Sequence, residues 1–325
     1  MSAVGPLWLE RMVSGIARAA SRKEPRPDRL WWAEDLPLRT VRVDGHDICF
    51  VSAGQGRPVV LVHGFATSLS IWSNQIRPLS EHFHVLALDL LGHGYSDKPD
   101  VGYGIDCFAS CVAGFLNAIG VESADLVGSS MGGLLSLCVA LTHPDRVHRL
   151  VLIGSSSPAY MPDRLKAARR FARRRPRLWK TICILSELLT LVPSRGIERR
   201  GKDRMFFDPE VVAPQWIEHA YELRRMEGFS RMLARTLESL SSEEEGEWPL
   251  ERIRQPTCLI WGEADAVIPV EHGRLLERRL EHATLNVIPA CGHLPMLEKP
   301  EVTTRCLLDF LLAPGAAAAR DAAAR

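Results

Sequence analysis

The sequence predicts an α/β fold: a mostly parallel central sheet with helices on both faces and an inserted helical cap. Short apolar runs alternate with helical patterns through most of the chain, as in folds built from strand–helix–strand units. The runs are apolar at consecutive positions, which is typical of strands buried on both faces of a parallel sheet. With 325 residues, 46% of them hydrophobic, the chain is long enough to form one large core.

The strands and helices of the predicted sheet follow one another in a regular order. Residues 38–53 come first and alternate around Asp44-Gly45, which indicates a β-hairpin. Apolar runs and amphipathic patterns then take turns. We expect strands at 59–64, 84–89, 124–129, 149–154, 257–262 and 284–289, and helices at 105–119, 131–141, 270–281 and 299–312.

Three segments fall outside this alternation. Residues 157–248 have helical patterns and no convincing strand pattern, so we interpret them as a cap inserted into the fold. Residues 7–20 have the spacing of an amphipathic helix, and a charged, proline-bearing linker follows them. The predicted organisation is 1–37 for the N-terminal helix and linker, 38–156 and 249–313 for the α/β core, 157–248 for the helical cap, and 314–325 for a disordered tail.

The composition argues against some classes of function. The 40 Lys and Arg residues nearly balance the 39 Asp and Glu residues, which argues against nucleic acid as a partner. The eight cysteines include no C-x-x-C pair and show no metal-ligand spacing. The N-terminus lacks the continuous apolar stretch of a secretory signal. We therefore expect no metal site, a reducing compartment and a cytoplasmic location.

The motif with the most specific chemistry is Gly128-Ser129-Ser130-Met131-Gly132, a G-x-S-x-G pattern. It directly follows an apolar strand and begins a helix, which would hold Ser130 on a sharp turn with its hydroxyl exposed. Gly128 and Gly132 would let the strand and the helix approach closely, because glycine has no Cβ. The first amides of the helix would point at developing negative charge. We therefore predict Ser130 as a nucleophile.

The loop after the strand at 59–64 supplies a second part of the predicted site. A loop at this place can put a backbone N–H opposite the one that follows the nucleophile. We therefore assign the oxyanion hole to the backbone N–H groups of Phe65 and Met131. His63 and Gly64 are expected to shape this loop, and His63 comes too early in the chain order to be the catalytic base.

Two later loops supply candidates for an acid and a base. Asp265 follows the strand at 257–262, and Glu263, two residues closer to that strand, is the rival acid. His293 lies in a glycine-flanked turn after the strand at 284–289. A histidine at this place is suited to act as the general base, with a carboxylate to orient it.

Four motifs in order make the sequence resemble the α/β-hydrolase superfamily across roughly residues 38–312: VHGF, DLLGHGYSD, GSSMGG, and WGEAD with CGH. The order Ser130, Asp265, His293 along the chain matches the order of that superfamily's triad. The resemblance implies the α/β-hydrolase fold, a serine nucleophile activated by His293, an Asp265 that orients the imidazole, and no cofactor. Superfamily members with aspartate at the serine position are dehalogenases or epoxide hydrolases, so Ser130 argues against both activities.

The sequence leaves three functions open. The leading one is a carboxylic-ester hydrolase, lipase-like or monoacylglycerol-lipase-like, whose partner is a small-molecule ester with an apolar acyl chain. The second is a carbon–carbon bond hydrolase of the meta-cleavage-product type, which the GSSMGG and CGH motifs resemble. The third is a ligand-binding protein without catalysis, since fold alone does not decide activity.

A basic segment in the predicted cap suggests a further partner. Residues 164–180 contain nine Lys or Arg residues and no acid, and an apolar run begins beside them at 178–192. One interpretation is a solvated basic helix followed by a helix that covers the active site. The other is peripheral contact of residues 164–192 with an anionic membrane surface, which the N-terminal helix at 7–20 would supplement.

Overall fold

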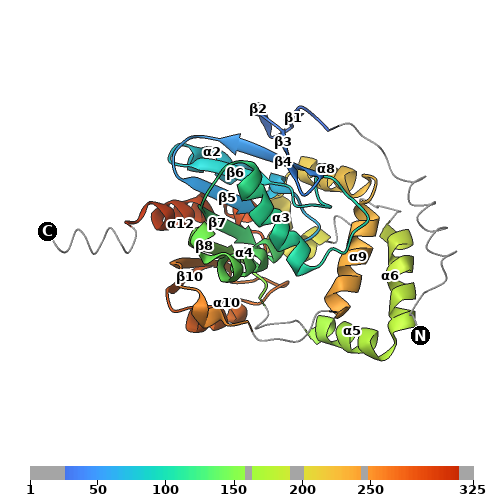
Figure 1. The fold of residues 1–325 in the computed structure, drawn as a ribbon. Coiled ribbons are helices and arrows are strands. Elements are labelled where there is room, and N and C mark those ends of the chain that lie inside the picture. Colours follow the sequence, from blue (N-terminus) through green and yellow to red (C-terminus); the bar gives the residue numbers. More distant parts are fainter. Residues whose placement is uncertain (1–25, 158–162, 191–200, 243–247, 315–325) are drawn as a thin grey trace.

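The structure is a computed structural model that describes residues 26–157, 163–190, 201–242 and 248–314. Its centre is an eight-stranded sheet with the strand order β10-β9-β8-β7-β5-β6-β4-β3 (Figure 1). Strands β10 to β6 pair in parallel, whereas β4 pairs antiparallel with both β6 and β3. The predicted fold class, a mostly parallel sheet surrounded by helices, is confirmed.

The strands of this sheet begin and end within two residues of their predicted positions. The hairpin around Asp44-Gly45 forms the antiparallel pair β3 and β4. The strands are β1 (Arg29–Leu30), β2 (Ala33–Pro37), β3 (Arg39–Val43), β4 (His46–Ala53), β5 (Pro58–Val62), β6 (His84–Leu88), β7 (Ala124–Ser129), β8 (Val147–Ile153), β9 (Thr257–Gly262) and β10 (Ala283–Ile288).

The central strands are apolar on both faces because each face packs against helices. In β5, Val59 and Leu61 belong to one buried cluster, whereas Val60 and Val62 belong to another. Successive side chains of a strand point to opposite faces, so the two clusters lie on opposite sides of the sheet. Helices α3, α4 and α10 pack on the side of Val60 and Val62, and helices α2, α11 and α12 pack on the opposite side.

The four helices predicted beside the sheet are confirmed, and α2 was not predicted. Its residues include Pro78 and several polar side chains, and it is stabilised by packing against α12 and β6. The helices are α2 (Ser73–Ser80), α3 (Ile105–Ala118), α4 (Met131–Thr142), α5 (Asp163–Arg174), α6 (Pro176–Thr190), α8 (Pro214–Arg224), α9 (Phe229–Ser242), α10 (Val270–Arg279), α11 (Pro295–Glu298) and α12 (Pro300–Leu312), with 3-10 turns η1 (Leu69–Trp72), η2 (Pro144–Arg146), η3 (Pro209–Val211) and η4 (Leu250–Arg252).

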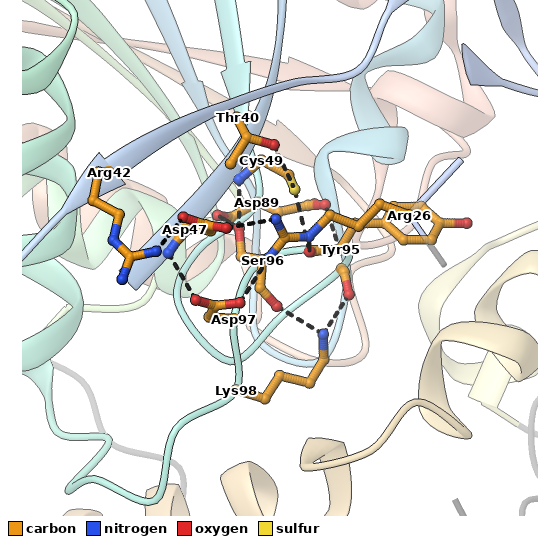
Figure 2. A network of polar contacts seen from close by, with 11 residues as sticks. Arg26, Thr40, Arg42, Asp47, Cys49, Asp89, Tyr95, Ser96, Asp97 and Lys98 are labelled. Carbon is orange, nitrogen blue, oxygen red and sulfur yellow. Dashed lines mark hydrogen bonds and ion pairs between the residues drawn. The ribbon is translucent and has the colours of Figure 1, made fainter. Parts of the chain in front are cut away.

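Residues 26–37 contain a short antiparallel hairpin, β1 and β2, where the sequence predicted a linker. Arg26 ties this segment to the sheet, because its guanidinium donates to Asp47 at 2.8 Å and to Asp97 at 2.6 Å (Figure 2). These partners lie far along the chain, so the local sequence does not reveal them. The helix predicted at 7–20 lies outside the described residues.

The segment between β8 and β9, where the sequence predicted a helical cap, contains helices α5, α6, α8 and α9. Helices α5, α6 and α9 pack on one another and lie together at one side of the sheet (Figure 1). The division into core and cap stays a prediction. So does the disordered tail at 314–325, which lies outside the described residues beyond position 314. Among the helices that the structure describes, none has the length and apolarity needed to cross a membrane.

Candidate active site

Ser130 lies at the turn where β7 ends and α4 begins. Its backbone has φ 53° and ψ −116°, a conformation that residues other than glycine rarely adopt. The Ser130 N–H donates to the carbonyl of Ile153 at 2.9 Å, which fixes the turn to the end of the neighbouring strand β8. Strained backbone of this kind persists only where the surrounding structure enforces it.

The glycines of the motif permit this turn because neither has room for a side chain. A Cβ on Gly128 would overlap the carbonyl of Gly132, and a Cβ on Gly132 would overlap the carbonyl of Val62. Strand β7, helix α4 and the end of β5 therefore meet at backbone distance. This close packing supports the predicted supporting roles of both glycines.

The loop after β5 lies directly against the serine. A Cβ placed on Gly64 would be 3.1 Å from the Ser130 Cβ and 3.7 Å from its Oγ. Within the described part of the chain, the backbone N–H groups of Phe65 and Met131 have no acceptor. These amides belong to the residues that follow Gly64 and Ser130, so they are suited to bind an oxyanion. Their assignment as an oxyanion hole stays a prediction.

His63 is buried and holds this loop through hydrogen bonds of its imidazole ring. Its side chain is buried, with Nδ1 2.8 Å from the carbonyl oxygen of Gly64. Its Nε2 accepts the N–H of Leu90 at 3.0 Å. Burial lowers the pKa of the imidazole. A neutral ring with both nitrogens engaged agrees with the shaping role proposed for His63.

His293 and Asp265 form a buried pair at the ends of β10 and β9. The Nδ1–H of His293 donates to Oδ2 of Asp265 at 2.8 Å. The other oxygen, Oδ1, accepts the N–H groups of Val267 and Ile268, both at 2.8 Å, which fixes the carboxylate within its own loop. The side chain of Glu263, by contrast, is exposed. The structure thus brings Asp265 against the histidine, while the catalytic roles of the two residues stay predictions.

The serine and the Asp–His pair both lie beside the end of β8. The carbonyl of Ile153 holds the Ser130 amide, and Gly154 comes next in the chain. A Cβ placed on Gly154 would be 3.2 Å from both Nδ1 of His293 and Oδ2 of Asp265. The three predicted residues therefore gather at the carboxyl end of the parallel sheet, the edge at which ligands bind in open α/β folds.

Glu298 is a residue of this site that sequence reasoning missed. Its buried carboxylate accepts the N–H of Gly292 at 2.6 Å and the N–H of Asp208 at 2.7 Å. His293 itself donates its backbone N–H to the carbonyl of Met205 at 2.7 Å. The histidine loop is thus held by the segment that precedes η3. No local sequence signal identifies Glu298, because its partner Asp208 is 90 residues away.

The DLLGHGYSD motif, residues 89–97, forms the loop that follows β6. Oδ1 of Asp89 accepts the N–H of Leu69 at 2.7 Å, and Oδ2 accepts the N–H of Tyr95 at 2.8 Å. The eight cysteines all lie in the described residues and form no disulfide, and burial raises the pKa of Cys291 to about 12. Within the described ranges, no three His, Cys, Asp or Glu side chains gather into a metal-binding group.

Comparison with known protein families agrees with this fold. A family model described as the alpha/beta hydrolase fold matches residues 57–300. The chain belongs to the α/β-hydrolase fold family. The superfamily resemblance predicted from the four motifs is thereby confirmed.

Three individual proteins show what this α/β hydrolase is similar to. A 2-hydroxy-6-oxo-2,4-heptadienoate hydrolase of Pseudomonas putida is 31% identical over 288 residues, which cover 85% of this chain and 96% of that protein. The crystal structure of a serine hydrolase involved in carbazole degradation has a TM-score of 0.70 at 25% identity, and covers 85% of this chain and 98% of its own. A membrane phospholipase A, described as a bacterial virulence factor, has a TM-score of 0.69 at 27% identity, and the match covers 94% of this chain and 90% of that one. These likenesses support hydrolase activity on a small molecule, and they favour the predicted alternative of carbon–carbon bond cleavage over the leading prediction of ester cleavage.

Proposed function

We propose that this α/β hydrolase is a serine hydrolase in which Ser130, His293 and Asp265 act together on a carbonyl carbon. The observation that carries the proposal is the arrangement around β8. Ser130 is held at φ 53° by the carbonyl of Ile153, and the Asp–His pair packs against the next residue, Gly154. Backbone strain clusters at active sites, where it pre-organises a reacting group.

The proposed mechanism assigns one step to each group. Because the Nδ1–H of His293 is bound by Asp265, Nε2 is the nitrogen that takes the proton of Ser130 as its hydroxyl attacks. The N–H groups of Phe65 and Met131 stabilise the oxyanion that forms. Water then hydrolyses the acyl-enzyme, with His293 again as the base.

The substrate class that we propose first is a 2-hydroxy-6-oxo-2,4-dienoate. The Pseudomonas putida relative carries such a compound in its name and matches this chain over 96% of its own length. In this class the carbonyl at C6 is the electrophile, and the addition of one water molecule breaks the C5–C6 bond. In the 2-keto tautomer, the electron pair of that bond delocalises towards the oxygen at C2. C6 leaves as a carboxylic acid. C5 already carries the proton that it gained when the substrate ketonised, so the oxygen at C2 takes a proton and the product is a 2-hydroxy-2,4-dienoate.

The second candidate is a carboxylic ester with an apolar acyl chain. It is supported by the likeness to a membrane phospholipase A over 94% of this chain. Attack by Ser130 on an ester carbonyl needs the same base and the same oxyanion hole, and the leaving group is an alcohol. The two candidates therefore differ in the pocket around the leaving group, and not in the nucleophile.

A substrate panel separates these functions. The panel contains 2-hydroxy-6-oxohepta-2,4-dienoate, p-nitrophenyl esters of graded chain length and monoacylglycerols. We expect the highest kcat/KM for the dienoate, whose cleavage is measured by the loss of its visible absorbance. Turnover of the esters alone would replace carbon–carbon cleavage by the second candidate. A protein that turns over neither class and resists fluorophosphonate labelling would be a ligand-binding protein.

Substitutions test the assigned residues. Ser130→Ala should lower the rate by about 10⁴–10⁶-fold and abolish fluorophosphonate labelling, with little change in the free energy of unfolding. Asp265→Asn should lower kcat by about 10⁴-fold, because the imidazole loses the partner that fixes its tautomer. The exposed Glu263, changed to Gln, should leave kcat within about twofold, as surface substitutions do. The opposite ranking of the two acid variants would move the acid to Glu263.

A further inference from the structure

The turn between α5 and α6 carries exposed arginines that have no acidic partner among the described residues. Residues 164–180 contain nine Lys or Arg residues and no acid. Among the described side chains of this segment, five exposed guanidinium groups form no ion pair and no hydrogen bond with any described residue. They belong to Arg170, Arg173, Arg174, Arg175 and Arg177. Uncompensated charges of one sign create a surface potential that attracts opposite charge.

Large apolar side chains are exposed on the same two helices. Phe171 is 38% exposed, Leu178 is 50% exposed and Ile182 is 40% exposed. Leu178 and Ile182 are four residues apart on α6, so they are neighbours on one helix face. Ala172 and Cys183, by contrast, are buried. The two helices therefore have an inner face that packs and an outer face that leaves apolar groups in water.

Packing holds this outer face in a defined place. Helices α5 and α6 contact each other and α9, and the rings of Phe171 and Trp179 pack across the turn with centroids 6.4 Å apart. Figure 1 shows the turn at the outer edge of the molecule, beyond α9 as seen from the sheet. The five arginines, with Phe171, Leu178 and Ile182, form the surface that is here called the α5–α6 surface.

We propose that the α5–α6 surface docks on an anionic lipid bilayer. The arginines lie at the headgroups, and Phe171, Leu178 and Ile182 enter the boundary between headgroups and acyl chains, as in amphipathic segments that bind membrane surfaces. The aliphatic side chains favour lipid over nucleic acid. A phosphate backbone would bind the arginines, but it offers no hydrocarbon interior that would remove Leu178 and Ile182 from water.

This proposal goes beyond the proposed function and does not depend on it. Docking concerns α5 and α6, whereas hydrolysis concerns the loops after β5, β7, β9 and β10. Binding is therefore measured without substrate, and activity is measured without lipid. A failure of either measurement leaves the other proposal standing.

The first experiment is co-sedimentation of the full chain with lipid vesicles. We expect binding to vesicles that contain phosphatidylglycerol and little binding to vesicles of pure phosphatidylcholine. Binding should weaken as NaCl is raised from about 0.02 M to about 0.5 M, because salt screens the attraction between arginines and headgroups. Absence of binding at low ionic strength, or equal binding to both vesicles, would overturn the proposal.

A charge-matched pair of variants locates the contact. Changing Arg174, Arg175 and Arg177 to Gln should weaken binding about 100-fold at low ionic strength. Arg173 is left unchanged because it also lines a cavity of about 700 Å³ beside Arg235. The control triple removes the same charge from exposed positions on β3, α10 and α12 by changing Arg39, Arg278 and Arg305 to Gln. An equal loss in the control would show that net charge alone, and not the α5–α6 surface, drives binding.

A second variant tests the apolar part of the contact. Leu178→Ser with Ile182→Ser should weaken vesicle binding about tenfold, because two side chains no longer leave water on docking. Both positions are at least 40% exposed, so the fold should tolerate the change. Unchanged vesicle binding, together with arginine-dependent binding to RNA of similar strength, would assign the surface to nucleic acid. Fluorophosphonate labelling of Ser130 in the absence of lipid should be the same in every variant.

Discussion

Replacing Glu298 by Gln tests whether the buried carboxylate positions the histidine loop. The carboxylate accepts the N–H groups of Gly292 and Asp208, and a carboxamide offers a single oxygen to these two donors. One amide would therefore face an NH₂ group. Losing one charge-assisted hydrogen bond and leaving a buried donor unpaired should lower the free energy of unfolding by about 2–4 kcal/mol. Because Gly292 precedes His293, we also expect kcat to fall about 10–100-fold.

Glu277→Gln is the matched control for this change. Oε1 of Glu277 accepts the N–H of Leu285 at 2.8 Å, which ties α10 to β10 away from the candidate site. This variant should lose about 1–2 kcal/mol of stability without a change in kcat. Urea unfolding gives the stabilities. The kinetic readout is the split between kcat and KM for the preferred substrate, supported by the rate of fluorophosphonate labelling.

If Glu298 positions the histidine loop, both variants should lose stability, but only Glu298→Gln should lose kcat. A Glu298→Gln protein with wild-type kcat would refute the reasoning, since it would mean that the histidine stays in place without the carboxylate. A rate loss in Glu277→Gln equal to that in Glu298→Gln would also refute it. In that case, lost stability alone would explain the lower activity.

Two further predictions follow from the same structure. Gly154→Ala and Gly120→Ala both place a side chain at positive φ, which should cost roughly 1–2 kcal/mol of stability in each variant. Only the Cβ at 154 would contact His293, so only Gly154→Ala should lower kcat by more than about tenfold. The buried guanidinium of Arg149 donates hydrogen bonds to three carbonyls at the end of α12. Arg149→Met should therefore lower the free energy of unfolding, measured in urea, by about 2–4 kcal/mol and leave kcat unchanged.

The buried strands are the part of this fold that the sequence predicts best. Strands 124–129 and 257–262 begin and end where they were expected. Each is buried on both faces, and apart from Asp125 and Thr257 the residues before its closing glycine or serine are apolar. Helix α2 was missed because its polar residues and Pro78 give a weak local signal, and tertiary packing stabilises it instead.

The candidate site was predictable where a loop directly follows a strand. Ser130 and His293 each occupy such a loop, and strand ends that share one edge of a parallel sheet bring such loops together. The acid was less certain, because Glu263 and Asp265 lie in one loop. Their different placement depends on the amides of Val267 and Ile268, which bind Asp265 and turn its free oxygen toward the histidine. Loop geometry of this kind has no periodic signature in a sequence.

The position of the histidine loop depends on its contact with the segment before η3. The carbonyl of Met205 binds the amide of His293, and the amide of Asp208 binds the carboxylate that also holds Gly292. A backbone shift at 205–208 would therefore displace the proposed base, even though no side chain of that segment has an assigned catalytic role. For this reason, substitutions in the predicted cap that alter substrate preference should be judged by kcat as well as KM. A shift of this segment can reach the histidine through its backbone hydrogen bond to Met205 and through the carboxylate of Glu298.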